Sequence, residues 1–169
     1  MPQGKSNISV GLFAMAAFMA YGFLLIYLRD FAPGKEAWIA DYAVGKHFEA
    51  RLAHVHGNLF AFLNIVIGYL LWQLPVPPAS ATWISRLALA GLLMPLGIVA
   101  ELVFGAPPVF VLLGAVAMAG AVAWLGLAVR RARLYWLLDA LPRLETLVRE
   151  MEVGTSRLDS ALSPVLLPA

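Results

Sequence analysis

The sequence predicts an all-α integral membrane protein in which four transmembrane helices form a bundle. Hydrophobic residues make up 62% of its 169 residues and charged residues 13%, whereas a soluble domain is about half apolar and about a quarter charged. A surface that faces lipid explains this surplus of apolar side chains. The chain also contains four apolar runs long enough to cross a hydrocarbon layer of about 30 Å, since a helix rises about 1.5 Å per residue.

Each apolar run is about 21 to 23 residues long and is interrupted by few polar side chains. The third contains Pro95 and Glu101, and the fourth begins after Pro107 and Pro108. The fourth also contains the small-xxx-small pairs Ala115/Ala119 and Ala117/Ala121, a spacing that lets helices approach closely. The four expected spans are residues 8–28, 52–74, 84–104 and 109–129.

Beyond the fourth span, the chain is predicted to form a cytoplasmic amphipathic segment, residues 130–152, followed by a loosely ordered tail, residues 153–169. Apolar residues recur there with heptad spacing at Leu134, Leu137, Leu141, Leu144, Val148 and Met151. The stripe covers under three heptads and contains Pro142, so the pattern favours a helix pair on the membrane surface over a coiled coil. Residues 1–129 are expected to form the transmembrane domain.

The distribution of basic residues predicts that both termini are cytoplasmic, because cytoplasmic loops carry an excess of Lys and Arg. The connection between the first and second spans carries Arg29, Lys35, Lys46 and Arg51, and the third connection carries none. The other basic residues fall on the opposite side: Lys5, Arg86, Arg130, Arg131, Arg133, Arg143, Arg149 and Arg157. We therefore expect a protein of the bacterial inner membrane whose first connection faces the periplasm.

This topology places three polar residues at a similar depth near the outer surface. His54 and His56 lie in the first turns of the second span, and Glu101 lies near the outer end of the third. A carboxylate inside a span costs a few kcal/mol and marks a functional site by default. The alternative is a structural pair in which Glu101 and a histidine or Arg51 hold the second and third spans together.

Helical geometry separates the two histidines. Because His54 and His56 are two residues apart, they point about 200° away from one another around a helix. His47, Arg51, His54 and Asn58 share one stripe if the helix begins early. Only one of the two histidines is therefore expected to be the main ligand, and His54 is our choice, with His56 and Asn58 as further cofactor-binding candidates.

A metal site is the second interpretation of the same residues. His47, His54, His56 and Glu101 together form a candidate oxygen- and nitrogen-rich site for copper, zinc or iron. Their spacing matches no established zinc motif, and a solvated outer loop is the simpler alternative. The absence of cysteine from the sequence excludes thiolate metal sites and disulfides, and no basic and aromatic block suggests nucleic-acid binding.

The stretch from Arg51 to Phe62 resembles the second transmembrane helix in the catalytic subunits of C-type haem-copper oxidases and nitric oxide reductases. That helix has the pattern Arg-Pro-Leu-His, five residues, then Phe-Ala-Phe, and the matching residues here are Arg51, His54, Phe60, Ala61 and Phe62. The resemblance implies that His54 is an axial ligand of haem b near the outer surface. It covers a dozen residues, and the later histidines of that family have no counterpart after His56.

If His54 binds haem, its sixth ligand is expected to be His56 through local unwinding, Met94 from the third span, or a residue of another protomer or subunit. We expect a small membrane protein that binds haem b or a metal ion, in electron transfer or metal handling, within a larger respiratory-type complex. The alternative is a non-catalytic accessory or assembly subunit in which His54 and Glu101 are structural. No nucleophile elbow or phosphate loop predicts a standalone enzyme.

Overall fold

The computed structural model describes the backbone of residues 4–166 and the side chains of residues 4–131, 142, 144–146 and 148–151. All regular structure in residues 4–166 is helical. Six helices follow one another: α1 (Lys5–Asp30), α2 (Lys35–Ala40), α3 (Lys46–Gln73), α4 (Pro78–Gly91), α5 (Leu93–Phe104) and α6 (Val109–Leu166).

Four helical segments are long and apolar enough to cross a membrane, as predicted for an integral membrane protein. They are Lys5–Asp30, Lys46–Gln73, Pro78–Phe104 and Val109–Arg131. Each segment contains nearly all of an expected span and most extend past it by a few polar or basic residues. A helix can continue past its apolar run, because its backbone hydrogen bonds form whether the side chains are apolar or polar.

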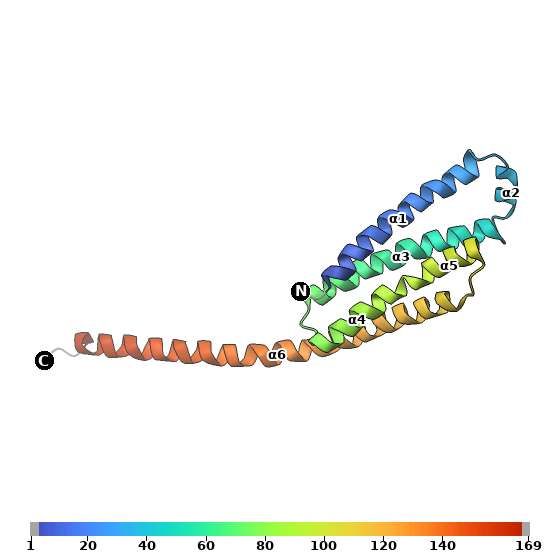
Figure 1. Ribbon diagram of the computed structural model, residues 1–169. Coiled ribbons are helices and arrows are strands. Elements are labelled where there is room, and N and C mark those ends of the chain that lie inside the picture. The colour runs from blue at the N-terminus through green and yellow to red at the C-terminus, as the bar shows by residue number, and fades with distance from the viewer. Residues whose placement is uncertain (1–3, 167–169) are drawn as a thin grey trace. The chain divides into compact units, whose positions relative to one another are not determined.

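The long helices lie side by side in the first compact unit, Met1–Val129 (Figure 1). Helix α1 packs against α3, and α3 packs against α4 and α5. Contacts at two glycines join α6 to the third span: Gly91 lies against Met118, and Gly114 lies against Met94. The short helix α2 rests against α1 and α3, so it closes one end of that helix pair.

Buried residues recur in alternating steps of three and four along the spans. In α4 and α5 this series is Ala81, Ile84, Ala88, Gly91, Pro95 and Ile98, with Gly97 buried beside it, and in α6 it is Gly114, Met118, Ala121, Leu125 and Ala128. This spacing keeps one narrow seam of each helix against its neighbour, as in left-handed helix bundles. Of the small residues expected to mediate packing, Ala121 is buried in the seam and Ala119 is exposed, and Gly114 and Ala128 also occupy the seam.

A polar cluster joins α1, α3 and α4 inside the bundle. Asn7 and Asn64 are both fully buried, and the Asn7 amide donates to Asn64 Oδ1 at 3.0 Å and to the Ser85 carbonyl at 3.0 Å. The Asn64 amide donates to the carbonyls of Phe60 and Ala88, while the Ser85 hydroxyl donates to Asn7 Oδ1. Every amide N–H of the pair has an acceptor, so the cluster avoids the cost of unsatisfied buried donors.

The third span is broken at Leu92, between α4 and α5. Pro95 has no N–H to donate to the carbonyl of Gly91, so the helical ladder is interrupted one turn before the proline. The span ends at Gly105, whose φ of 65° is left-handed and whose N–H bonds to the Glu101 carbonyl at 2.9 Å. This is a common helix stop, because glycine adopts that conformation without steric cost.

The second compact unit comprises Arg130–Ala169. Helix α6 continues through Pro142 and Gly154 to Leu166, including part of the segment whose composition suggests loose order. Residues 167–169 of the expected tail lie outside the described residues.

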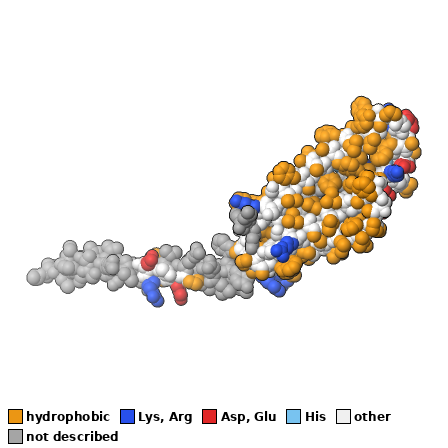
Figure 2. Space-filling view, viewed as in Figure 1, with side chains coloured by type: hydrophobic (Ala, Val, Ile, Leu, Met, Phe, Trp, Pro, Cys, Tyr) orange, Lys and Arg blue, Asp and Glu red, His pale blue; other side chains and the backbone are white. Residues whose placement is uncertain are grey.

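The face of the transmembrane unit shown in Figure 2 is mainly hydrophobic. Large exposed apolar side chains on α1 and α6 include Phe13, Phe23, Leu112 and Val116. Exposed apolar surface on this scale is costly in water and favourable in a bilayer. The surface therefore agrees with the lipid environment predicted from composition.

Candidate functional site

A cavity of about 400 Å³ opens between α1 and α3, close to the end that α2 closes. The two sides of the cavity differ in the polarity of their side chains. Helix α1 contributes mostly apolar residues, whereas α3 and the connection before it contribute polar side chains. The lining residues are Met19, Gly22, Phe23, Leu25, Ile26, Arg29, Tyr42, His47, Arg51 and His54.

The imidazole of His54 is held in one tautomer by the backbone of α1. Its Nδ1 lies 2.8 Å from the Phe18 carbonyl oxygen. Because a carbonyl only accepts hydrogen bonds, Nδ1 must carry a proton in this contact. In the neutral tautomer protonated at Nδ1, the lone pair lies on Nε2. A backbone carbonyl on one imidazole nitrogen is the usual way to orient a histidine whose other nitrogen binds a metal.

The absence of a side chain at Gly22 leaves room for the imidazole ring of His54. A Cβ atom at this position would lie 2.6 Å from His54 Cε1, closer than real Cβ contacts allow. The half-buried imidazole therefore lies directly on the backbone of α1. Sequence reasoning singled out His54 but missed Phe18 and Gly22, because an apolar span offers no signal of which face meets its neighbour.

His47 is fixed in the same way at the closed end of the cavity. Its Nδ1 lies 2.9 Å from the Trp38 carbonyl oxygen, and the side chain is only 3% exposed. The ring stacks on Trp38 with centroids 4.8 Å apart and meets the Tyr42 ring edge-on at 5.2 Å. The short helix α2 is thus anchored to α3 through His47. The Nε2 atom of this ring, like that of His54, remains available as a ligand atom.

His56 and Asn58 occupy different positions. His56 donates from Nδ1 to the Leu52 carbonyl of its own helix and lies near Phe60, and it is not part of the cavity wall. Asn58 donates to the His54 carbonyl at 2.9 Å. The contacts of His54 and His56 lie on different sides of the helix, as expected. Of the predicted stripe, His47, Arg51 and His54 line the cavity, and Asn58 does not.

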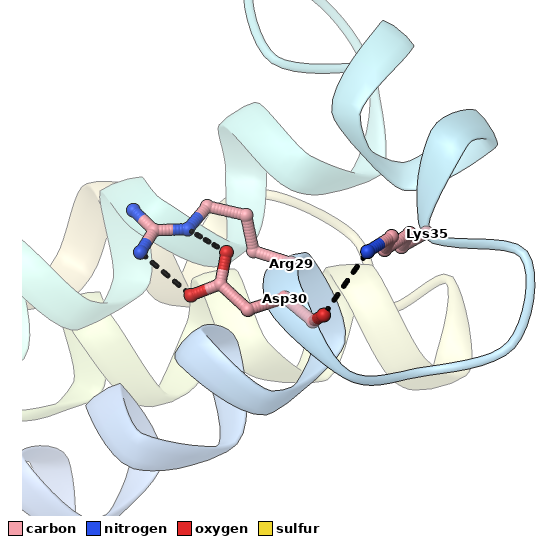
Figure 3. A network of polar contacts seen from close by, with 3 residues as sticks. All are labelled: Arg29, Asp30 and Lys35. Carbon is pink, nitrogen blue, oxygen red and sulfur yellow. Dashed lines mark hydrogen bonds and ion pairs between the residues drawn. The ribbon is translucent and has the colours of Figure 1, made fainter.

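Two arginines lie at the edge of the cavity, and their charges are balanced differently. Arg29 forms a two-point ion pair with Asp30, at 2.9 and 2.8 Å, and Lys35 donates to the Asp30 carbonyl at 3.2 Å (Figure 3). Arg51 instead lies over the Tyr42 ring, 3.8 Å from its centroid, and donates to the Tyr42 carbonyl. Within the described side chains, Arg51 has no carboxylate partner.

Glu101 lies on α5 with its side chain exposed. Within the described part of the chain, no hydrogen bond or ion pair joins Glu101 to His54 or His56. Among the same residues, no three or more histidine and acidic side chains come close enough to hold one metal ion together. The geometry therefore groups His54 with His47 and Arg51, and leaves Glu101 apart from them.

The chain matches no known protein family, no curated protein and no solved structure. Its function is therefore inferred from the chemistry of the cavity.

Proposed function

We propose that this membrane protein binds haem b in the cavity between α1 and α3, with His54 Nε2 as an axial ligand, and acts in electron transfer. The observation that carries the proposal is the 2.8 Å contact between His54 Nδ1 and the Phe18 carbonyl, beside a largely apolar cavity. This contact leaves Nε2 free as a ligand atom and fixes the ring that presents it.

The surroundings of His54 fit a haem better than a bare metal ion. Met19, Phe23 and Ile26 supply apolar contacts for a macrocycle, and Arg51 supplies a cation at the cavity edge. A lone copper, zinc or iron ion would need several ligands at about 2 Å, and only His47 and His54 offer imidazole nitrogens to the cavity. Bound haem would supply an iron atom that accepts and releases one electron.

The residues that line the cavity favour candidates other than His56 and Met94 for the second haem ligand. Neither His56 nor Met94 lines the cavity, whereas His47 and Met19 do. Imidazole nitrogen and thioether sulfur are both known axial ligands of haem iron. We propose these two residues, or a ligand from a second protomer or another membrane subunit, for the remaining position.

The proposed setting is a respiratory-type complex in the bacterial inner membrane. The basic residues favour an orientation in which His54 lies at the periplasmic end. A haem near that surface would be within reach of an electron donor or acceptor in the periplasm.

An absorption titration tests the proposal directly. Full-length protein in detergent micelles is titrated with haem in oxidised and reduced form, and copper, zinc and iron are measured by mass spectrometry in protein purified from membranes. We expect a saturable Soret band with one haem per chain. Protein that produces no specific band and carries no stoichiometric metal would exclude both haem and metal binding.

The second candidate function is an accessory subunit in which His54 only joins two helices. The contacts of His54 with Phe18 and Gly22 favour it, because they tie α1 to α3 without any ligand. Under this alternative, His54→Ala lowers the thermal stability of haem-free protein and the native protein co-purifies with larger membrane subunits. Haem binding with unchanged stability of the apo-variant would instead support the ligand role.

A further inference from the structure

The apolar heptad pattern of α6 continues well beyond the residues that the sequence analysis singled out. Positions separated by alternating steps of three and four extend without a break along the helix that follows the fourth span. In register order they are Leu134, Leu137, Leu141, Leu144, Val148, Met151, Thr155, Leu158, Leu162 and Val165, all apolar except Thr155. At about 1.5 Å per residue, this stripe is about 48 Å long.

The helix carries residues that oppose helix formation, so it needs a packing partner. Inside a helix, relative to alanine, proline costs about 3 kcal/mol and glycine about 1 kcal/mol, yet α6 continues through both Pro142 and Gly154. In proteins, most of the stability of a helix comes from packing of its apolar face. Because α6 is continuous, the reason for expecting Pro142 to prevent a coiled coil no longer holds.

The described part of the stripe is exposed. Leu144 and Val148 have exposed fractions of 56% and 49%, and they lie one turn apart on the same stripe, at heptad positions d and a. Their neighbours Glu145 and Arg149 are charged and exposed. An amphipathic helix of this kind buries its apolar stripe against another surface.

The charges of the segment argue against a membrane surface as that partner. Helices that lie on membranes carry Lys and Arg along their polar face. Between Leu134 and Val165 the acidic residues Asp139, Glu145, Glu150, Glu152 and Asp159 outnumber the basic residues Arg143, Arg149 and Arg157. An anionic lipid surface would therefore repel residues 134–165, although Arg130, Arg131 and Arg133 directly before them would be attracted to it.

We propose that residues 134–165 form a parallel two-stranded coiled coil with the same segment of a second copy of the chain. A strict repeat of 3.5 residues is complementary to itself, since each stripe supplies the a and d positions that the other needs. Copies inserted in one membrane with the same orientation present this segment on the same side, so the two helices enter the coiled coil in the same direction.

The acidic residues beside the stripe also select the parallel arrangement. Glu145, Glu152 and Asp159 occupy heptad position e, and Ala140, Leu147 and Gly154 occupy position g. In a parallel pair, position e of one helix faces position g of the other, so the carboxylates meet uncharged residues. In an antiparallel pair, the e positions of the two helices face each other and the carboxylates would repel one another.

Disulfide cross-linking tests the proposal in the full-length protein, because the native chain contains no cysteine. Leu144→Cys places a thiol at position d, and the matched control Thr146→Cys places one at position f, on the opposite side. Membranes containing each variant are oxidised and separated without reductant. We expect a homodimer band at least ~10-fold stronger for Leu144→Cys. Equal bands, or a band of Leu144→Cys with a different protein, would overturn the proposal.

A second pair of variants measures the oligomeric state without cross-linking. The mass of full-length protein in detergent is measured by light scattering, with the detergent contribution subtracted. We expect a dimer for the native chain and for Thr146→Asp, and a monomer for Leu144→Asp, which places a charge in the apolar seam. A native monomer, or a dimer that survives Leu144→Asp, would overturn the proposal. A monomer would exclude a haem ligand from a second protomer, but neither outcome decides whether His54 itself binds haem.

Discussion

Asn7 and Asn64 are 57 positions apart in the sequence and share a hydrogen bond of 3.0 Å between two fully buried side chains. They join the first turn of α1 to the second half of α3, and both reach α4 through the carbonyls of Ser85 and Ala88. The three helices are therefore held in one register by polar contacts that apolar packing alone would not specify.

Replacement of Asn64 should lower stability more than its size suggests. Asn64→Ala removes three hydrogen bonds and leaves the buried Asn7 amide with one acceptor fewer, at a cost of about 1–3 kcal/mol. Thermal unfolding in detergent, followed by circular dichroism, measures the loss. The control is Thr82→Ala, which removes one bond within α4, and an equal loss in both variants would contradict a special role for the cluster.

Gly114 and Gly120 should respond to alanine with opposite signs. A Cβ atom at Gly114 would lie 2.1 Å from the backbone nitrogen of Met94, whereas at Gly120 the nearest neighbour is 4.0 Å away. Gly114→Ala should push α6 from α5 and cost about 1–3 kcal/mol. Gly120→Ala should be neutral or add up to about 1 kcal/mol through helix propensity. Unfolding temperatures that fall together would show that α6 does not approach α5 at Gly114.

Gly22→Ala should weaken haem binding while the bundle stays folded. The new methyl group would meet the end of the His54 side chain rather than backbone, so the imidazole must turn away from its carbonyl partner. Loss of an orienting partner typically costs about 10–100-fold in affinity. Haem titration of Gly22→Ala beside Gly126→Ala, whose Cβ would meet nothing within 4 Å, measures this change. Unaltered affinity in Gly22→Ala would show that the ring orientation is unimportant.

His54→Ala should abolish haem binding, and His56→Ala should have a weaker effect. The two residues differ in surroundings: His54 lines the cavity, and His56 donates to the Leu52 carbonyl of its own helix. The Soret band of each single variant, at equal protein concentration, provides the comparison. Full retention of haem in both variants would refute the choice of His54 as ligand.

The sequence predicted the spans well because lipid exposure imposes composition on every turn of a helix. Residues 8–28 and 109–129 lie entirely within α1 and the first part of α6. A shared stripe of His47, Arg51, His54 and Asn58 was also predicted, since positions seven and four apart lie on one face of any helix. The first three of these residues line the cavity. These features depend on distance along a single helix.

Contacts between helices were harder to predict. A span that is apolar on all sides has no sequence feature that shows which face meets a neighbour, so Gly22 and Phe18 were missed. Of the alanines expected to allow close packing in the fourth span, Ala121 is buried but Ala119 is exposed. Asn7 was overlooked because it precedes the apolar run and resembles an ordinary polar terminus. Similarly, equal depth in the membrane suggested an approach of His54 and Glu101, but depth does not fix rotation about the helix axis.

The stack of Trp38 on His47 makes the cavity accessible to fluorescence spectroscopy. With ring centroids 4.8 Å apart, the excited indole lies in contact with an imidazole that quenches its emission once it carries a positive charge. Replacement of the other tryptophans with phenylalanine would leave Trp38 as the only tryptophan of the chain. These residues are Trp72, Trp83, Trp124 and Trp136. A ligand or proton that binds His47 then changes the fluorescence intensity of Trp38, so no external label is needed.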